Sequence, residues 1–291
     1  MKMSPPVKNS IFALFLLLVL SSFPLFGETS ADFSTNLSVE WSSGEAELTF
    51  RFPLSEEQDP SPHVRNKFTR KSRSELGFSF VEEFSRLHLN SRQSIGDFLK
   101  KNPESALPLN AVAKRYTSST SSFARDYSEF RITYSYSLYP HIIEHLFSHT
   151  SASSPDRLLR YVPSGSFSGI VIYVEKELPV HGTSRAANIT PCLFPKIYNE
   201  HTELIVSKEM LPPETLKNWG IAGYFPIDKR EDLSSRIGDV PLYIKAKALF
   251  GETPTDIIIP NEGANSMLST EHTIRLITEG KIAIVYTPQS H

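Results

Sequence analysis

The sequence predicts an α+β fold with mixed β-sheets, few helices and two small subdomains. Apolar and polar residues alternate over 45–53 and 130–138, which is typical of strands with one face in water. Residues 169–174 form a nearly continuous β-branched run, which is typical of a strand buried on both faces. Apolar residues recur at helical spacing in only a few segments, so we expect strands to dominate.

The first half is expected to contain short helices beside its strands. A weak alternation at 37–41 precedes the first clear strand, and residues 55–73 are charged and contain proline, which favours a mobile loop. A helix is predicted at 74–89, because four apolar residues recur there at helical spacing. Shorter helices are predicted at 94–101 and 141–149.

The second half is expected to be richer in strands. One helix is predicted at 261–278, and Gly280 is expected to end it. Strands are expected at residues 169–174, 192–198, 221–225, 242–249, 256–259 and 282–286. The chain has no fixed-period repeat and no glycine-rich phosphate loop.

The N-terminus predicts export. Lys2 and Lys8 precede an uncharged apolar run at residues 11–20, which is too short for a bilayer core that takes roughly 20 residues. We predict a signal peptide at residues 1–27, cleaved after Gly27 or alternatively after Ala31, and a mature chain in the periplasm or cell envelope. Membrane association is expected to be peripheral at most.

Three further segments follow the predicted signal peptide. We expect an N-terminal α+β region at 28–150, a linker at 151–168 and a β-rich C-terminal domain at 169–291. The linker is rich in serine and proline, which is typical of a connection between domains.

Composition excludes several classes of protein. The formal charge is −2 and becomes −4 without Lys2 and Lys8, which does not indicate a nucleic-acid-binding surface. Cys192 is the only cysteine, so an internal disulfide and a cysteine-rich metal site are excluded. We expect its thiol to be buried as a small apolar side chain.

One local pattern resembles a catalytic metal site. His141, Glu144 and His145 match the H-x-x-E-H arrangement of inverted zinc peptidases, in which two histidines on one helix face bind zinc and the glutamate takes a proton from bound water. Glu214 is the candidate third ligand. The segment is short and follows Pro140, so the preferred interpretation is a surface helix with no catalytic residue, no metal and no cofactor.

Six segments of the second half carry a recognisable pattern: 167–174 (FSGIVIYV), 191–199 (PCLFPKIYN), 219–224 (WGIAGY), 238–246 (GDVPLYIKA), 255–260 (TDIIIP) and 280–285 (GKIAIV). In these segments the chain resembles FlgP-type envelope proteins, a family of secreted bacterial proteins and outer-membrane lipoproteins that includes flagellar accessory components. The resemblance implies a non-catalytic domain that assembles with envelope or motility components, as rings or discs. No cysteine stands near the predicted cleavage point, so a lipid anchor is not implied.

These observations predict a non-enzymatic secreted envelope protein, a structural or flagellum-associated assembly module. Its expected partners are envelope or flagellar proteins, with a homo-oligomer as one form of assembly and no nucleic acid. Exposed strand edges are the expected contact surface. Two alternatives remain: a zinc-dependent hydrolase that uses Glu144, His141, His145 and Glu214, and a periplasmic ligand-binding module.

Overall fold

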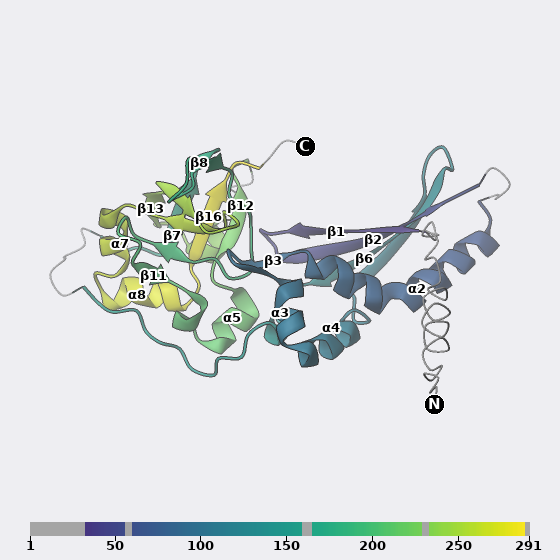
Figure 1. The fold of residues 1–291 in the computed structure, drawn as a ribbon, viewed down its shortest axis with the longest axis horizontal. Coiled ribbons are helices and arrows are strands. Elements are labelled where there is room, and N and C mark those ends of the chain that lie inside the picture. Colours follow the sequence, from purple (N-terminus) through teal and green to yellow (C-terminus); the bar gives the residue numbers. More distant parts are fainter. Residues whose placement is uncertain (1–32, 56–59, 159–164, 229–232, 289–291) are drawn as a thin grey trace, which may run out of the picture.

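A computed structural model describes residues 33–55, 60–158, 165–228 and 233–288 (Figure 1). The predicted signal peptide and both predicted cleavage points lie outside the described residues. The fold is α+β, as the sequence predicts. Figure 1 shows two parts side by side along the long axis of the molecule, each with its own sheets. We call the parts the first domain, residues 33–145, and the second domain, residues 166–288.

The first domain contains a four-stranded antiparallel sheet in the order β1-β2-β6-β5. Its inner strands confirm the two segments with clear alternation, and the side chains that alternate inward are buried. The strands are β1 (Ser34–Glu40), β2 (Glu45–Pro53), β5 (Ser118–Phe123) and β6 (Glu129–Ser137).

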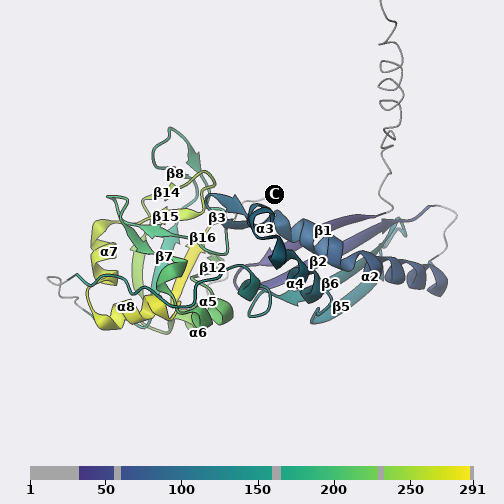
Figure 2. The same ribbon diagram turned by 60° about the horizontal axis from the view of Figure 1, so that its bottom comes forward.

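Helix α2 (Pro62–Ser85) covers the inner face of this sheet (Figure 2). It begins well before the predicted residue 74, so most of the predicted loop at 55–73 was wrong. Ser61 caps the helix by accepting a hydrogen bond from the backbone N–H of Val64, and Pro62 suits the first helical turn. The first turns carry few apolar residues, which is why helical periodicity missed them.

The other elements of the first domain are short and lie after α2 in the chain. The helix predicted at 94–101 is confirmed as α3 (Ile95–Lys101), whose N-terminus is closed by a reciprocal capping box between Ser94 and Asp97. The remaining elements are β3 (His88–Asn90), β4 (Gln93–Ser94), η1 (Pro103–Ser105), α4 (Ala106–Val112) and η2 (Ile143–His145).

The core of the second domain is a four-stranded parallel sheet in the order β12-β16-β7-β13. The apolar runs at its centre are buried on both faces, which confirms the prediction for residues 169–174. The strands are β7 (Ile170–Val174), β12 (Gly223–Pro226), β13 (Leu242–Lys245) and β16 (Ile282–Tyr286).

A second sheet, in the order β11-β10-β15-β14, packs in the same domain. The strand predicted at 242–249 was wrong as one unit, because the chain leaves the parallel sheet after Lys245 and continues in this sheet. Of the predicted 192–198, only the last two residues are extended. The strands are β10 (Ile197–Tyr198), β11 (Leu204–Val206), β14 (Ala248–Phe250) and β15 (Asp256–Ile258), with a separate hairpin of β8 (Leu178–Pro179) and β9 (Ala186–Ala187).

The predicted helix at 261–278 is two helices. Thr270 interrupts it, because its hydroxyl caps a new helix by accepting a hydrogen bond from the backbone N–H of Thr273. Gly280 follows with a positive φ of 66°, as expected of a helix stop. The helices of the second domain are α5 (Pro213–Trp219), α6 (Ser234–Ile237), α7 (Asn261–Met267) and α8 (Glu271–Thr278), with η3 (Lys208–Met210).

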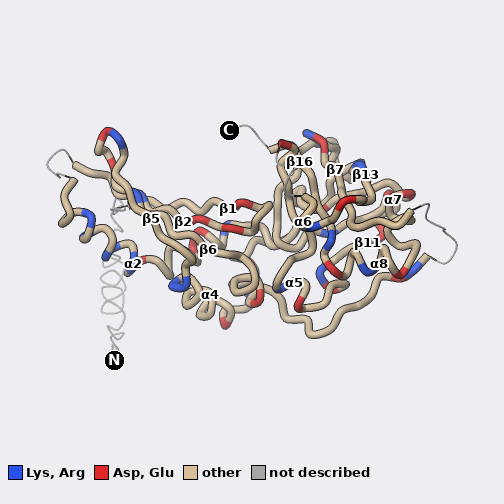
Figure 3. The backbone as a smooth tube through the Cα atoms, turned by 180° about the vertical axis from the view of Figure 1, so that it is seen from behind, with Lys and Arg blue, Asp and Glu red and all other residues tan. Residues whose placement is uncertain are grey.

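Lys, Arg, Asp and Glu residues are distributed along the backbone of both domains (Figure 3). Within the described ranges, no helix combines the length and apolar character needed to cross a bilayer.

Candidate functional site: the cavity between the domains

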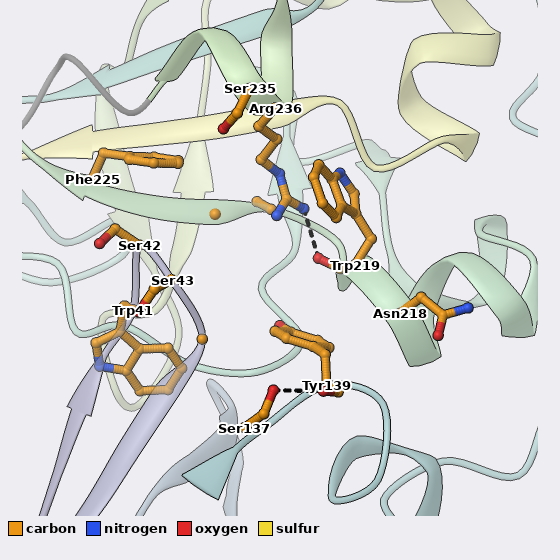
Figure 4. Close-up of a pocket in the computed structure, with 13 residues that line it drawn as sticks. Trp41, Ser42, Ser43, Ser137, Tyr139, Asn218, Trp219, Phe225, Ser235 and Arg236 are labelled. Atoms are coloured by element: carbon orange, nitrogen blue, oxygen red, sulfur yellow. Dashed lines mark hydrogen bonds between the residues drawn. The ribbon is translucent and has the colours of Figure 1, made fainter. Parts of the chain in front are cut away.

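A cavity of about 410 Å³ lies where the two domains meet (Figure 4). The first domain contributes the β1–β2 turn and the end of β6, and the second contributes α5, β12 and α6. Its described lining residues are Trp41, Ser42, Ser43, Gly44, Ser137 and Tyr139 from the first domain, and Asn218, Trp219, Ala222, Gly223, Phe225, Ser235 and Arg236 from the second.

Tyr139 packs between two glycines, one from each domain. A Cβ atom at Gly44 would lie 2.8 Å from Cδ2 of the ring, and a Cβ atom at Gly220 would lie 2.4 Å from the hydroxyl oxygen. Both glycines have positive φ, 71° and 72°, a conformation that L side chains rarely adopt. The close approach of the domains here therefore requires glycine at residue 220, and the packing of Tyr139 on the β1–β2 turn of its own domain requires glycine at residue 44.

Arg236 is the only charged side chain among the described lining residues. It is 9% exposed, and its guanidinium donates to three backbone carbonyls: Nε to Gly280 O at 3.0 Å, and Nη2 to Trp219 O at 2.9 Å and Gly220 O at 3.3 Å. The guanidinium carbon also lies 5.0 Å from the centroid of the Trp219 ring, a cation–π distance. These contacts fix the guanidinium against the end of α5.

Burial governs the ionisation of the groups around the cavity. Loss of water lowers the pKa of Arg236 to about 10, so the side chain is still a cation at neutral pH. Burial raises the pKa of Tyr139, and the nearby Arg236 opposes that shift. The phenol therefore keeps its proton at neutral pH.

A second junction lies at the β3–β4 hairpin, which packs on the second domain. The backbone of Phe194 donates to Leu89 O at 2.9 Å, and the hydroxyl of Ser91 donates to Oδ2 of Asp256 at 2.7 Å. Asp256 is 1% exposed, and its Oδ1 also accepts from the backbone N–H of Lys196 at 3.1 Å. The β3–β4 hairpin therefore joins the two domains at a place separate from the cavity.

The structure does not assemble the H-x-x-E-H pattern into a metal site. The predicted helix at 141–149 was wrong, because only η2 (Ile143–His145) is helical and it is a 3₁₀ helix, in which residues i and i+4 do not share a face. His141 and His145 therefore lack the geometry of a zinc helix. Among the described residues, no three histidine, cysteine or acidic side chains gather closely enough to hold a metal ion.

The glutamates of that pattern make other contacts. Glu144 pairs with Lys217 of α5 at 2.7 Å, and this hydrogen bond lowers the pKa of the carboxyl. Glu214 accepts from the side-chain amide of Asn218 at 3.4 Å. Glu144 thus links η2 of the first domain to α5 of the second.

Sequence patterns missed the cavity, because its residues come from distant short segments with no common spacing. Cys192, expected to be buried, is 1% exposed, and its sulfur lies 3.7 Å from the Tyr224 hydroxyl. Burial raises the pKa of this thiol to about 12, so it stays protonated at neutral pH.

Comparison with known families matches each domain separately. Residues 32–145 match the model of the N-terminal domain of Treponema pallidum Tp0624, and residues 169–288 match the model of its second domain. The chain carries two domains of the Tp0624 type. The cavity is formed where the two matched regions meet. Neither match names FlgP-type proteins, so the resemblance to that family remains a prediction. No curated protein matches the chain.

Proposed function

We propose that this Tp0624-type chain is an exported, non-enzymatic envelope protein that acts as an assembly module. Its partners would be envelope proteins or a second copy of the chain, and a flagellum-associated, FlgP-like assembly is the candidate setting. The observation that supports this proposal is an outer strand edge in the first domain that pairs with no strand of the described residues.

That edge is β5 (Ser118–Phe123), the outermost strand next to β6. Its sequence, SSTSSF, contains neither proline nor a charged residue, and five of its six side chains are exposed. Proteins that remain monomeric commonly block such edges with lysine, proline or a bulge. An edge with none of these devices favours addition of a strand from a partner.

The hydrogen-bonding pattern identifies which groups of β5 are available. The backbone N–H of Ala124 donates to Glu129 O at 2.9 Å, and bonded and non-bonded pairs alternate along an antiparallel ladder. The N–H groups of Ser119 and Ser121 therefore point away from β6, toward the free edge. A partner strand would accept hydrogen bonds from them.

Substitution of Ser121 tests the proposal. Ser121→Pro removes an outward N–H without removing a bond to β6, and Ser121→Ala is the matched control that keeps the N–H. We expect the mature chain and its Ser121→Ala variant to form larger species in size-exclusion chromatography with cross-linking on envelope fractions, and Ser121→Pro to lose them. Equal behaviour of the two variants, or a strictly monomeric parent chain without neighbours, would contradict an assembly role of β5.

A further inference from the structure

Within the described part of the chain, the cavity between the domains has one positively charged side chain and no carboxylate paired with it. Arg236 is buried there, and neither the described lining residues nor its hydrogen-bond partners include a carboxylate. A buried cation without a counter-ion is unfavourable, because backbone carbonyls replace only part of its hydration. An anion that enters the cavity would therefore be stabilised.

Part of the guanidinium remains available to such an anion. Nε and Nη2 of Arg236 donate to backbone carbonyls, whereas Nη1 makes no hydrogen bond to any described residue. Figure 4 shows the guanidinium directed toward the Tyr139 ring and the turn that carries Ser42 and Ser43. The free Nη1 group has two N–H donors, and guanidinium N–H groups match the oxygens of a carboxylate or phosphate.

The serines of the cavity favour a ligand with hydroxyl groups. Ser42 donates its proton to Oε1 of Glu40 at 2.7 Å, and Ser137 donates to Tyr139 O at 2.6 Å. Each hydroxyl has a single proton but two acceptor lone pairs, so both can still accept a hydrogen bond. The ring of Trp41 lies beside them and offers an apolar surface (Figure 4).

We propose that this cavity binds a small hydroxylated organic anion, with one carboxylate or phosphate group paired to Arg236. Its volume of about 410 Å³ lies within the range of small-molecule sites, roughly 300–1,000 Å³. Ligand oxygens would accept from Nη1, and ligand hydroxyls would donate to Ser42 and Ser137. This binding function is independent of β5 and needs no catalytic group.

Tryptophan fluorescence is a direct probe of this cavity. The chain has two tryptophans, Trp41 and Trp219, and both line it. We expect gluconate or glucose 6-phosphate to change the fluorescence of the mature chain in a saturable way, and uncharged glucose to have no effect. The first two probes separate a carboxylate from a phosphate ligand.

A charge placed in the cavity gives the decisive comparison without disturbing the contacts of Arg236. Ser43→Asp adds a carboxylate at an exposed turn position, and Ser43→Asn adds a group of the same shape without charge. We expect Ser43→Asp to weaken binding by about tenfold or more and Ser43→Asn to leave it nearly unchanged.

Three results would overturn the proposal. One is the absence of saturable binding of both gluconate and glucose 6-phosphate. Another is equal binding by Ser43→Asp and Ser43→Asn. The third is binding of glucose, or of inorganic phosphate, as tight as that of the hydroxylated anions. Tight binding of glucose would show that the anionic group is not needed, and tight binding of phosphate would show that the hydroxylated carbon chain is not needed.

Discussion

The hydroxyl of Tyr139 lies against Gly220, so close that a Cβ atom at residue 220 would come within 2.4 Å of it. Tyr139 follows β6 of the first domain, and Gly220 ends α5 of the second. The pair therefore joins the two domains, and residue 220 of the second domain has no room for a side chain. Together with the contact of Ser91 and Asp256, it explains how two small domains form one unit.

Gly220→Ala is expected to lower the free energy of unfolding by more than the cost of placing alanine at a positive φ, because the new methyl group would also clash with Tyr139. Gly182 is the comparison position, since it also has a positive φ, 77°, but nothing within 4 Å of its would-be Cβ. Gly182→Ala should cost about 1–2 kcal/mol, and Gly220→Ala about 1–3 kcal/mol more through overpacking. Urea denaturation measures both. Equal losses would show that the contact with Tyr139 does not restrict residue 220.

Phe80 should be a main determinant of the stability of the first domain. It is fully buried in α2, and its ring centroid lies 4.7 Å from that of Tyr136 in β6. Phe80→Ala should lower the free energy of unfolding by about 3–5 kcal/mol. Phe78, two residues earlier, is 68% exposed, so Phe78→Ala should change it by only about 0.5 kcal/mol. Similar losses for both would contradict the placement of α2.

Asp256 should make stability depend on pH. Burial raises the pKa of its carboxyl above the ordinary value near 3.8. The folded state then binds a proton more tightly than the unfolded state, so this carboxyl contributes stability at low pH that is lost as pH rises through the raised pKa. Asp256→Asn can keep an acceptor for Lys196 N and should remove this dependence.

Denaturant unfolding from pH 4 to neutral pH measures the effect of Asp256→Asn. The variant should gain stability relative to the parent chain as pH rises. A difference between the two proteins that stays constant, or that changes in the opposite direction, would contradict the raised pKa. Ser91→Ala is a useful companion, because it removes the 2.7 Å hydrogen bond to Oδ2 but keeps the carboxyl.

Export should leave a defined N-terminus. Cleavage after Gly27 predicts that protein purified from the envelope fraction begins at Glu28. Intact-mass spectrometry gives the residue directly. A cytosolic protein whose mass still includes Met1 would exclude both the predicted compartment and the envelope function proposed for it.

The central strands of the second domain could be predicted, because strands that are buried on both faces have nearly continuous apolar sequences. Ile170–Val174 and Ile282–Tyr286 are apolar throughout and lie at the centre of a parallel sheet. By contrast, Ser118–Phe123 is a strand only because it pairs with β6; its serine-rich sequence has the composition of a loop. Edge strands of this kind depend on tertiary context.

The cavity was beyond sequence reasoning for a related reason. Trp41 and Arg236 are almost 200 residues apart, and only the packing of the two domains brings their segments to one cavity. The H-x-x-E-H pattern failed for a different reason: its spacing was correct for an α-helix, but the segment forms only the single 3₁₀ turn η2 (Ile143–His145). Spacing predicts chemistry only where the expected element forms.

The most direct test of the assembly role is photo-cross-linking from the β5 edge in living cells. A photoreactive residue at Ser119 should give discrete cross-linked species with an envelope protein or a second copy, and adding Ser121→Pro should abolish them. The same residue at exposed Phe78 on α2 should give none of these species. Cross-links that persist with Ser121→Pro, or that never form at Ser119, would contradict the proposal that this chain assembles through β5.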